Sequence, residues 1–252
     1  MIADTLLVFR RSLARSLRAP QWVLIGLSQP LLYLALFGPL LRRVVASSTD
    51  FPPGDSWQGF VPGLLVQLAL FGSAFAGFDL VFEKQSGVLE RMRVTPVSRA
   101  ALLAGRVLKD VVMLAAQSVV LVGVAVLAGL DLSVGGAVAG LGVVLLLGGA
   151  MAAVSYTIAL GTPTPDVLAS VLNTAAVPLL LLSGVLLPMS LAPRWLELAS
   201  GANPLRWVVD AERSVFRGDV LTGDVLVGAA VATACLVLAG AFGTRAFRRA
   251  AA

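Results

Sequence analysis

Few residues in this chain could do chemistry, and their types exclude most kinds of catalytic site. The sequence has no histidine, a single cysteine, Cys235, and only two lysines, Lys84 and Lys109. The usual zinc sites, histidine-dependent triads and internal disulfides therefore have no basis here. No G-x-x-x-x-G-K-[ST] or G-x-S-x-G stretch occurs, so neither a nucleotide-phosphate loop nor a serine nucleophile elbow is predicted. We expect no catalytic residue, cofactor or metal in this chain.

The remaining candidates are carboxylates in unusual places. Asp79 and Glu83 are four residues apart, which puts two like charges on one helix face and requires a compensating partner. Glu212 lies in a segment, 204–217, whose apolar residues share one helical arc: Leu205, Val208, Val209, Val215 and Phe216. Four charged residues occupy the opposite arc: Arg206, Asp210, Arg213 and Arg217.

Glu212 projects into the apolar arc, where a carboxylate is costly unless it is paired or faces a polar cavity. One interpretation is a role in a gate or in a substrate path. The other is that the side chain snorkels to water or pairs with a neighbour.

The elements that position these residues are membrane spans. Hydrophobic residues make up 58% of the chain, charged residues only 13%, and the mean hydropathy is +0.92. One globule of 252 residues cannot hide that much apolar surface, so lipid must be part of its solvent. Six apolar runs are each long enough to cross a bilayer: residues 22–41, 60–82, 111–130, 134–160, 167–187 and 225–242. The sequence predicts an all-α integral membrane protein with six transmembrane helices.

The positive charges indicate an orientation. With the N-terminus in the cytoplasm, 13 of the 19 Lys and Arg residues fall in cytoplasmic segments and six fall outside. This bias, together with an even number of spans, predicts that both termini are cytoplasmic. Arg42 and Arg43 oppose it locally, but they follow the first span directly and can snorkel to headgroups. We therefore interpret the net charge of +5 as a signal of orientation in the membrane, and we expect no nucleic-acid partner.

Residues 1–19 predict an amphipathic helix in the cytoplasmic interface, in contact with membrane lipid. Five apolar residues share one arc: Ile2, Leu6, Phe9, Leu13 and Leu17. Three arginines lie nearly opposite: Arg11, Arg15 and Arg18. A simpler interpretation, a positive flank that only sets orientation, is equally compatible with the pattern.

The cytoplasmic loop 83–109 is the most charged stretch of the chain. Thr95-Pro96 interrupts a helix, because the residue before proline avoids the α region. Ser98 is a candidate N-cap for a new short helix before the third span. Such an elbow suits docking against another protein, although an ordinary solvated loop remains the alternative. On the other side, prolines punctuate the segment 188–222, for which we expect short external re-entrant helices before the last span.

Four stretches, in this order along the chain, are similar to one family. They are L-S-Q-P-L-L-Y-L-A-L-F-G (27–38), F-E-K-Q-S-G-V-L-E-R-M-R-V-T-P-V-S-R (82–99), L-L-S-G-V-L-L-P (181–188) and N-P-L-R-W-V-V-D-A-E-R (203–213). Together they resemble the type-2 ABC transporter permeases of the daunorubicin-resistance and nodulation-exporter kind. The resemblance covers most of the chain.

The resemblance implies one transmembrane domain over residues 1–252 that exports drugs, lipids or polysaccharides from the bacterial cytoplasm across the inner membrane. It implies two partners, a separate ATP-binding cassette ATPase and a second permease copy in a homo- or heterodimer. Coupling to the ATPase would involve the residues that match the loop motif, which are Glu83, Gly87, Leu89, Glu90, Arg91, Thr95 and Pro96. Gly87 would permit close approach. Asn203 and Pro204 join Glu212 as candidates for an external gate or substrate path.

Two other functional classes remain to be weighed. The runner-up is a membrane scaffold or assembly subunit that transports nothing. A membrane-embedded enzyme is disfavoured, because the sequence shows no nucleophile and base that could form a set. Apart from Asp79 the predicted spans carry no ionisable group, which argues against a proton-relaying pump and for an energy source in another subunit.

Overall fold

The computed structural model describes residues 2–18, 21–47, 56–87, 98–185, 189 and 192–249. Within these residues the regular structure is entirely helical, which confirms the predicted all-α class. The helices are α1 (Ile2–Leu17), α2 (Gln21–Ser47), α3 (Ser56–Ala74), α4 (Gly77–Gln85), α6 (Arg99–Leu127), α7 (Val134–Gly161), α8 (Pro165–Leu181), α9 (Arg194–Gly201), α10 (Pro204–Phe216) and α11 (Gly223–Arg249).

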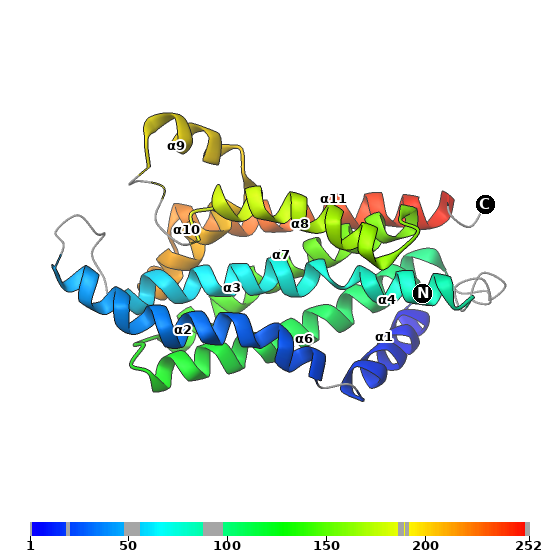
Figure 1. Ribbon diagram of the computed structural model, residues 1–252, viewed down its shortest axis with the longest axis horizontal. Coiled ribbons are helices and arrows are strands. Elements are labelled where there is room, and N and C mark those ends of the chain that lie inside the picture. Colours follow the sequence, from blue (N-terminus) through cyan, green and yellow to red (C-terminus); the bar gives the residue numbers. More distant parts are fainter. Residues whose placement is uncertain are drawn as a thin grey trace.

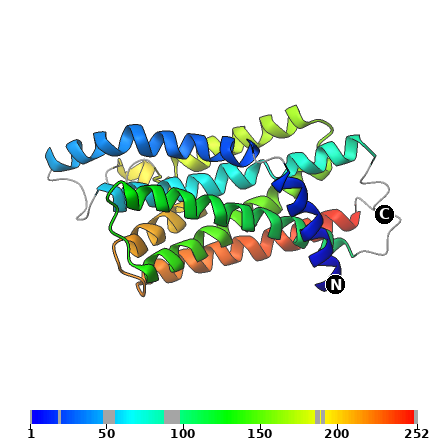
Figure 2. The ribbon, with the colours of Figure 1, turned by 90° about the horizontal axis from the view of Figure 1, so that it is seen from below.

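The long helices run side by side along the longest axis of the molecule, and the short ones sit at its two ends (Figure 1). Helix α1 crosses the bundle at the end where both termini lie, which the view from below also shows (Figure 2). Helices α9 and α10 lie at the opposite end. The chain ends therefore share one end of the bundle, as the prediction of an even number of crossings requires.

Five helical segments in the described part of the chain are long and apolar enough to cross a membrane: Val23–Leu40, Trp57–Gln85, Arg99–Leu127, Val134–Gly161 and Gly223–Arg249. The remaining predicted span, 167–187, corresponds to α8, which has 17 residues and ends at Leu181. At 1.5 Å per residue α8 is about 25 Å long, slightly less than the roughly 30 Å of a hydrocarbon core. A turn follows at Gly184, whose φ is +75°. The sixth crossing therefore stays a prediction.

The core is built around α3 and α7. Every residue from 61 to 70 in α3 is buried, and α7 contributes the fully buried Leu147 and Tyr156. By contrast, α2 and α8 expose large apolar side chains such as Leu36 and Leu181. This distribution is typical of a membrane bundle, in which lipid-facing side chains are as apolar as those of the core.

The third predicted span begins earlier than expected. The sequence places a short helix and then a separate span at 111–130, but the structure has one continuous helix, α6, from Arg99 to Leu127. Ser98 is its N-cap, as predicted, and the Ser98 hydroxyl accepts a hydrogen bond from the Ala101 amide at 3.2 Å. Charged residues continue the helix without a break because they find buried partners, described below.

The second predicted span, 60–82, is interrupted. Helix α3 ends at Ala74 and α4 begins at Gly77. Ser155 of α7 bridges the break, because its hydroxyl accepts from the Gly77 amide at 3.0 Å and donates to the Ala74 carbonyl. A Cβ on Gly77 would stand 2.7 Å from the Ser155 carbonyl oxygen, so glycine is required for this approach. A neighbouring helix thus satisfies the backbone groups that the break frees.

Replacing Ser155 with alanine should lower the free energy of unfolding by about 1–3 kcal/mol, because two buried backbone groups lose their partner. Thermal unfolding of the purified protein in detergent measures the effect. Ser170→Ala is the matched control, since the Ser170 hydroxyl only bonds the Asp166 carbonyl on the exposed side of α8. Equal shifts for both variants would show that Ser155 does not hold the break.

Candidate functional site

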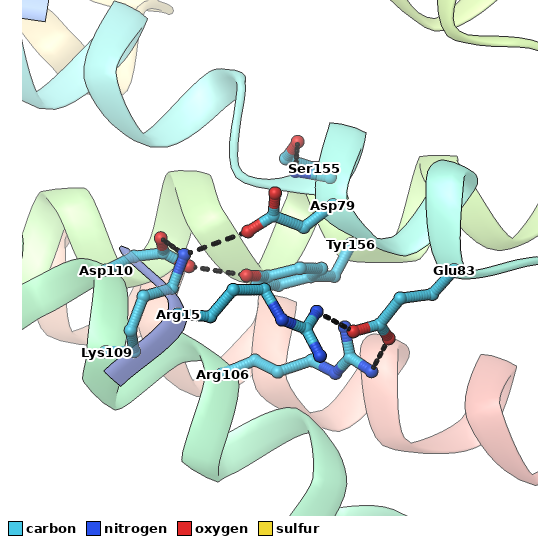
Figure 3. A network of polar contacts seen from close by, with 9 residues as sticks. Arg15, Asp79, Glu83, Arg106, Lys109, Asp110, Ser155 and Tyr156 are labelled. Carbon is cyan, nitrogen blue, oxygen red and sulfur yellow. Dashed lines mark hydrogen bonds and ion pairs between the residues drawn. The ribbon is translucent and has the colours of Figure 1, made fainter. Parts of the chain in front are cut away.

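Seven side chains from four helices meet in a charged cluster near the end of the bundle that holds both termini. We call this set the charged cluster: Arg15, Asp79, Glu83, Arg106, Lys109, Asp110 and Tyr156. It contains three acids and three bases, so its formal charge is balanced. Figure 3 shows the side chains converging from α1, α4, α6 and α7.

Glu83 is the hub of the first half of the cluster. Its carboxylate accepts from Arg15 of α1 on one oxygen and from Arg106 of α6 on the other, the latter at 2.5 Å. The side chains of Glu83 and Arg106 are 11% and 5% exposed, so this ion pair is largely screened from solvent. Glu83 therefore joins three helices, and it is not a free acidic group on the surface.

Lys109 organises the second half. Its ammonium lies 2.5 Å from an oxygen of Asp110 and 3.4 Å from an oxygen of Asp79. The hydroxyl of Tyr156 donates to the other Asp110 oxygen at 2.7 Å. The Arg106 guanidinium lies 5.9 Å from the centre of the Tyr156 ring and so connects the two halves. The repulsion expected between Asp79 and Glu83 is thus resolved, because each carboxylate has its own cation.

Several charged residues lie within longer helices than the sequence predicts. The predicted spans exclude them, but Arg106, Lys109 and Asp110 lie within the apolar helix α6, and Glu83 within the segment Trp57–Gln85. That the membrane-crossing parts carry no acid or base apart from Asp79 stays a prediction. Hydropathy places such charges outside a span because it scores each residue alone. The spacing of Arg106 and Lys109–Asp110, three to four residues apart, was the available signal that they share one helix face.

Helix α1 rests on α6 at a glycine. A Cβ on Gly105 would stand 2.7 Å from the Thr5 carbonyl oxygen and 2.8 Å from Val8 Cβ, so a larger residue would push α1 away. The helix predicted at 1–19 is confirmed, and three members of its apolar arc, Ile2, Leu6 and Leu17, are exposed in this chain. Arg15, predicted on the solvent face, instead binds Glu83. Contact of α1 with lipid stays a prediction.

The motif residues assigned to coupling are only partly described. Glu83 lies in the charged cluster, and Gly87 follows the last turn of α4. Leu89, Glu90, Arg91, Thr95 and Pro96 lie outside the described residues. The φ of Gly87 is +70°, and its amide donates to the Lys84 carbonyl at 3.2 Å. Among the described residues nothing lies within 4 Å of where its Cβ would stand, and its left-handed turn alone favours glycine here. Close approach of a partner at Gly87 stays a prediction.

At the opposite end, Asn203 and Pro204 begin α10. The Asn203 side chain accepts from the Leu205 amide at 3.0 Å and donates to the Leu179 carbonyl of α8 at 2.7 Å. These two residues start the helix and tie it to α8, whereas Glu212 lies two turns further along. The structure therefore does not bring Asn203 or Pro204 directly to Glu212.

The apolar arc predicted for α10 is buried throughout. Arg213, predicted on the opposite arc, is buried too, with 7% of its surface exposed. It donates to the Gly184 carbonyl at 2.7 Å and to the Gly59 carbonyl at 3.2 Å, so it links α10 to α3 and to the turn after α8. Helical periodicity predicts only which side chains share one face of a helix. It cannot predict that a charged side chain such as Arg213 is buried because backbone carbonyls accept its hydrogen bonds.

Glu212 is fully buried, and neither carboxyl oxygen has a hydrogen-bond partner among the described residues. Its side chain packs against Gly140 of α7, where an added Cβ would stand 2.8 Å from one carboxyl oxygen. Burial raises the pKa of the Glu212 carboxyl well above its usual range. The interpretation that Glu212 snorkels to water or pairs with a neighbouring side chain does not describe this environment. The other interpretation, a role in a gate or in a substrate path, stays a prediction.

Comparison with known proteins identifies relatives. Residues 4–216 match the ABC-2 type transporter family. The chain is 28% identical to a protein named transport permease ycf38 from Cyanophora paradoxa over 218 residues, which cover 85% of this chain and 74% of ycf38. It is 23% identical over 191 residues to the daunorubicin resistance permease DrrB1 of Streptomyces coeruleorubidus, covering 75% of this chain and 66% of DrrB1.

A third relative is the doxorubicin resistance permease DrrC of Mycobacterium tuberculosis, 29% identical over 122 residues, which cover 48% of this chain and 43% of DrrC. The family match extends from α1 through α10, so both the charged cluster and Glu212 lie within it. With its apolar helical bundle and this match over most of its length, the chain belongs to the ABC-2 type transporter family and is a multi-pass membrane permease subunit.

Proposed function

We propose that this chain is the permease subunit of an ATP-driven exporter that moves a drug-like, lipid-like or glycan substrate out across the bacterial cytoplasmic membrane. A separate ATP-binding cassette subunit supplies the energy, and a second permease copy completes the pathway. Two of the relatives are named for resistance to daunorubicin or doxorubicin, which favours an amphipathic cargo. Both termini face the cytoplasm in this proposal, as the positive-charge bias indicates.

The observation that carries the proposal is the position of Glu83. The segment 88–97, which holds most of the loop motif, is flanked in sequence by α4 and α6. The Glu83 carboxylate of α4 binds Arg106 near the start of α6 and Arg15 of α1. A displacement of the loop by an ATPase would therefore be felt by three helices at once. We assign Glu83 as a positioning residue that transmits this displacement.

The exposed apolar faces of α2 and α8 are proposed to meet lipid and the second permease copy. Leu24 and Leu36 of α2 and Val177 of α8 are each at least half exposed in the single chain. A bilayer or a partner helix can cover such faces equally well, because helix association in lipid depends on packing and not on the hydrophobic effect.

Glu83→Gln should reduce coupling several-fold in the complex reconstituted with its ATPase, because a neutral amide cannot hold two guanidinium groups in place. The measurements are permease-stimulated ATP hydrolysis and uptake of daunorubicin into inverted vesicles. Glu197→Gln is the control, since Glu197 is an exposed carboxylate on α9 at the other end of the bundle.

Two results would count against this assignment. Unchanged hydrolysis and unchanged uptake with Glu83→Gln would remove Glu83 from coupling. Vesicles that contain the intact complex but transport nothing, across anthracycline, lipid and glycan probes, would favour a scaffold subunit instead. Size-exclusion chromatography of the variant complex separates a loss of coupling from a loss of assembly.

A further inference from the structure

Helix α10 packs closely against α7 and α11 at glycine residues of those two helices. A Cβ on Gly136 of α7 would stand 2.9 Å from the Val215 carbonyl oxygen, and one on Gly228 of α11 would stand 2.6 Å from the Trp207 carbonyl oxygen. Gly136 and Gly140 are one helical turn apart and form one strip of α7. We call the contact of this strip with Glu212 and Val215 the α7–α10 seam. Small residues allow such close backbone approach between membrane helices.

The seam contains a carboxyl group to which no described residue donates a hydrogen bond. Both oxygens of Glu212 lack a hydrogen-bond partner in the described part of the chain, and the residue is 0% exposed. Groups of this kind are rare in native structures and call for an explanation. Leucine or valine would fill the same space without that cost, so the carboxyl group is not required for packing.

The charged groups on the surrounding helices do not neutralise Glu212. Helix α3 has no Asp, Glu, Lys, Arg or Tyr, and the tyrosine of α7, Tyr156, lies near the last turns of that helix and bonds Asp110. The titratable groups of α9 are Arg194 and Glu197, and those of α11 are Asp224, Cys235, Arg245, Arg248 and Arg249. On α10 itself, Arg206 pairs with Asp210, Arg213 bonds backbone carbonyls, and Arg217 bonds Ser214. None of these groups forms a hydrogen bond with the Glu212 oxygens.

An ionised carboxylate in this setting would lack both water and a cation, which costs several kcal/mol in a protein interior. Binding a proton removes most of that cost. Closed packing of the seam and ionisation of Glu212 therefore exclude one another. Separation of α10 from α7 would let water reach the carboxyl group and allow it to ionise.

We propose that Glu212 is a proton-binding site whose occupancy holds the α7–α10 seam closed, so that external proton concentration controls opening at this end of the bundle. That this end faces the outside rests on the proposed function, whereas the linkage between protonation and seam closure does not. The ligand is the proton itself, and the site responds to pH without any other bound molecule.

The direction of the pH effect follows from linkage. In the open seam the Glu212 pKa returns toward the ordinary value for glutamate, about 4.3, and in the closed seam burial raises it. Closure is therefore fully favoured below the open-state pKa and is lost as pH rises toward the closed-state pKa. Within that window the closed-to-open ratio falls by up to about tenfold for each pH unit.

The first experiment measures protonation directly. Infrared difference spectra of the full-length chain in liposomes, titrated with acid and base, report the carbonyl stretch of protonated carboxylic acids. We expect a band that persists at pH values above the ordinary glutamate pKa of about 4.3, is absent in Glu212→Gln and is retained in Glu197→Gln. Absence of any band that depends on Glu212 would overturn the proposal.

The second experiment measures opening with a cysteine in the seam. Cys235, the single cysteine, is first replaced with alanine, and Val215→Cys is added as the reporter. Its labelling rate with a membrane-impermeant maleimide is compared with and without Glu212→Gln at each pH, which cancels the intrinsic pH dependence of the thiol. We expect the rate in the chain that keeps Glu212, divided by the rate in the Glu212→Gln chain, to rise with pH above the ordinary glutamate pKa, by up to about tenfold for each pH unit. Equal pH dependence in both backgrounds would overturn the proposal.

Glu212→Leu serves as a second proton-free variant if the glutamine variant does not fold. It should show the same loss of the infrared band and the same loss of pH-dependent labelling. Neither measurement needs an ATPase or a transported compound, so failure here leaves the exporter assignment intact. Conversely, failure of transport in the reconstituted complex would not contradict the linkage between protonation of Glu212 and closure of the seam.

Discussion

Replacing Lys109 with methionine should destabilise the protein by about 3–5 kcal/mol, the expected cost of removing one partner from a buried ion pair. The Lys109 side chain is 6% exposed, and its ammonium lies between the Asp110 side chain, 11% exposed, and the more accessible Asp79. Without it, the Tyr156 hydroxyl is the one partner left to Asp110 among the described residues. For a chain of this size, each kcal/mol of lost stability lowers the midpoint temperature of unfolding by about 2–4 °C. The midpoint measured by thermal unfolding in detergent should therefore fall by roughly 6–20 °C.

The chain offers a matched control, because its other lysine is solvent-facing. Lys84 donates to the carbonyls of Leu160 and Thr162 at 3.1 and 3.3 Å and so interacts with the end of α7. Lys84→Met removes the same charge without stranding a buried acid, and we expect at most about 1 kcal/mol of destabilisation. Similar losses from both methionine variants would contradict the role assigned to Lys109.

A double variant separates two contributions to the stability lost by Lys109→Met: the cost of leaving Asp110 as an unpaired buried charge, and the net stabilisation that the ion pair provides. Lys109→Met combined with Asp110→Asn removes both charges and leaves an amide that Tyr156 can still bond. We expect this variant to recover at least half of the stability lost by Lys109→Met alone, because replacing both members of a buried pair is often nearly neutral. No recovery would mean that Lys109 acts through packing of its aliphatic stem.

The approximate positions of the five long apolar helical segments could be predicted, because hydropathy measures the transfer of side chains into lipid, which largely decides whether a segment can cross a membrane. Their ends could not. Helix α6 begins at Arg99, not at residue 111, because the charges at its start are paired with residues that lie elsewhere in the sequence. The break at residues 75–76 depends on Ser155, which is about 80 residues away and carries no local signal.

The candidate residues were partly visible in the sequence, and their partners were not. Periodicity marked Glu212 as an anomaly in an apolar arc, and spacing marked Asp79 and Glu83 as needing cations. Which cations they take depends on how the helices pack, for example on the close approach of α1 to α6 at Gly105, and no sequence motif records such packing. The same limit explains why Arg213 looked solvent-facing, since its partners are backbone carbonyls, which no side-chain pattern records.

Replacing Arg213 with leucine should loosen the attachment of α10 and destabilise the protein by about 2–4 kcal/mol. Its guanidinium donates to the Gly184 and Gly59 carbonyls, and hydrogen bonds from a charged donor are worth about 1.5–3 kcal/mol each. The variant leaves these carbonyls without that donor in a buried setting. Thermal unfolding measures the loss, with Arg217→Leu as control, because Arg217 is exposed and bonds Ser214 within its own helix.

Arg213→Lys tests whether the forked shape of the guanidinium matters or only its charge. The two acceptors lie on separate elements and are reached by different nitrogens, Nη2 for Gly184 and Nε for Gly59. A lysine ammonium is a single point donor on a flexible stem and cannot reproduce that fork. We expect Arg213→Lys to recover no more than about half of the lost stability. Full recovery would show that a positive charge near the end of α8 suffices, and that α10 is held to α3 by its apolar face alone.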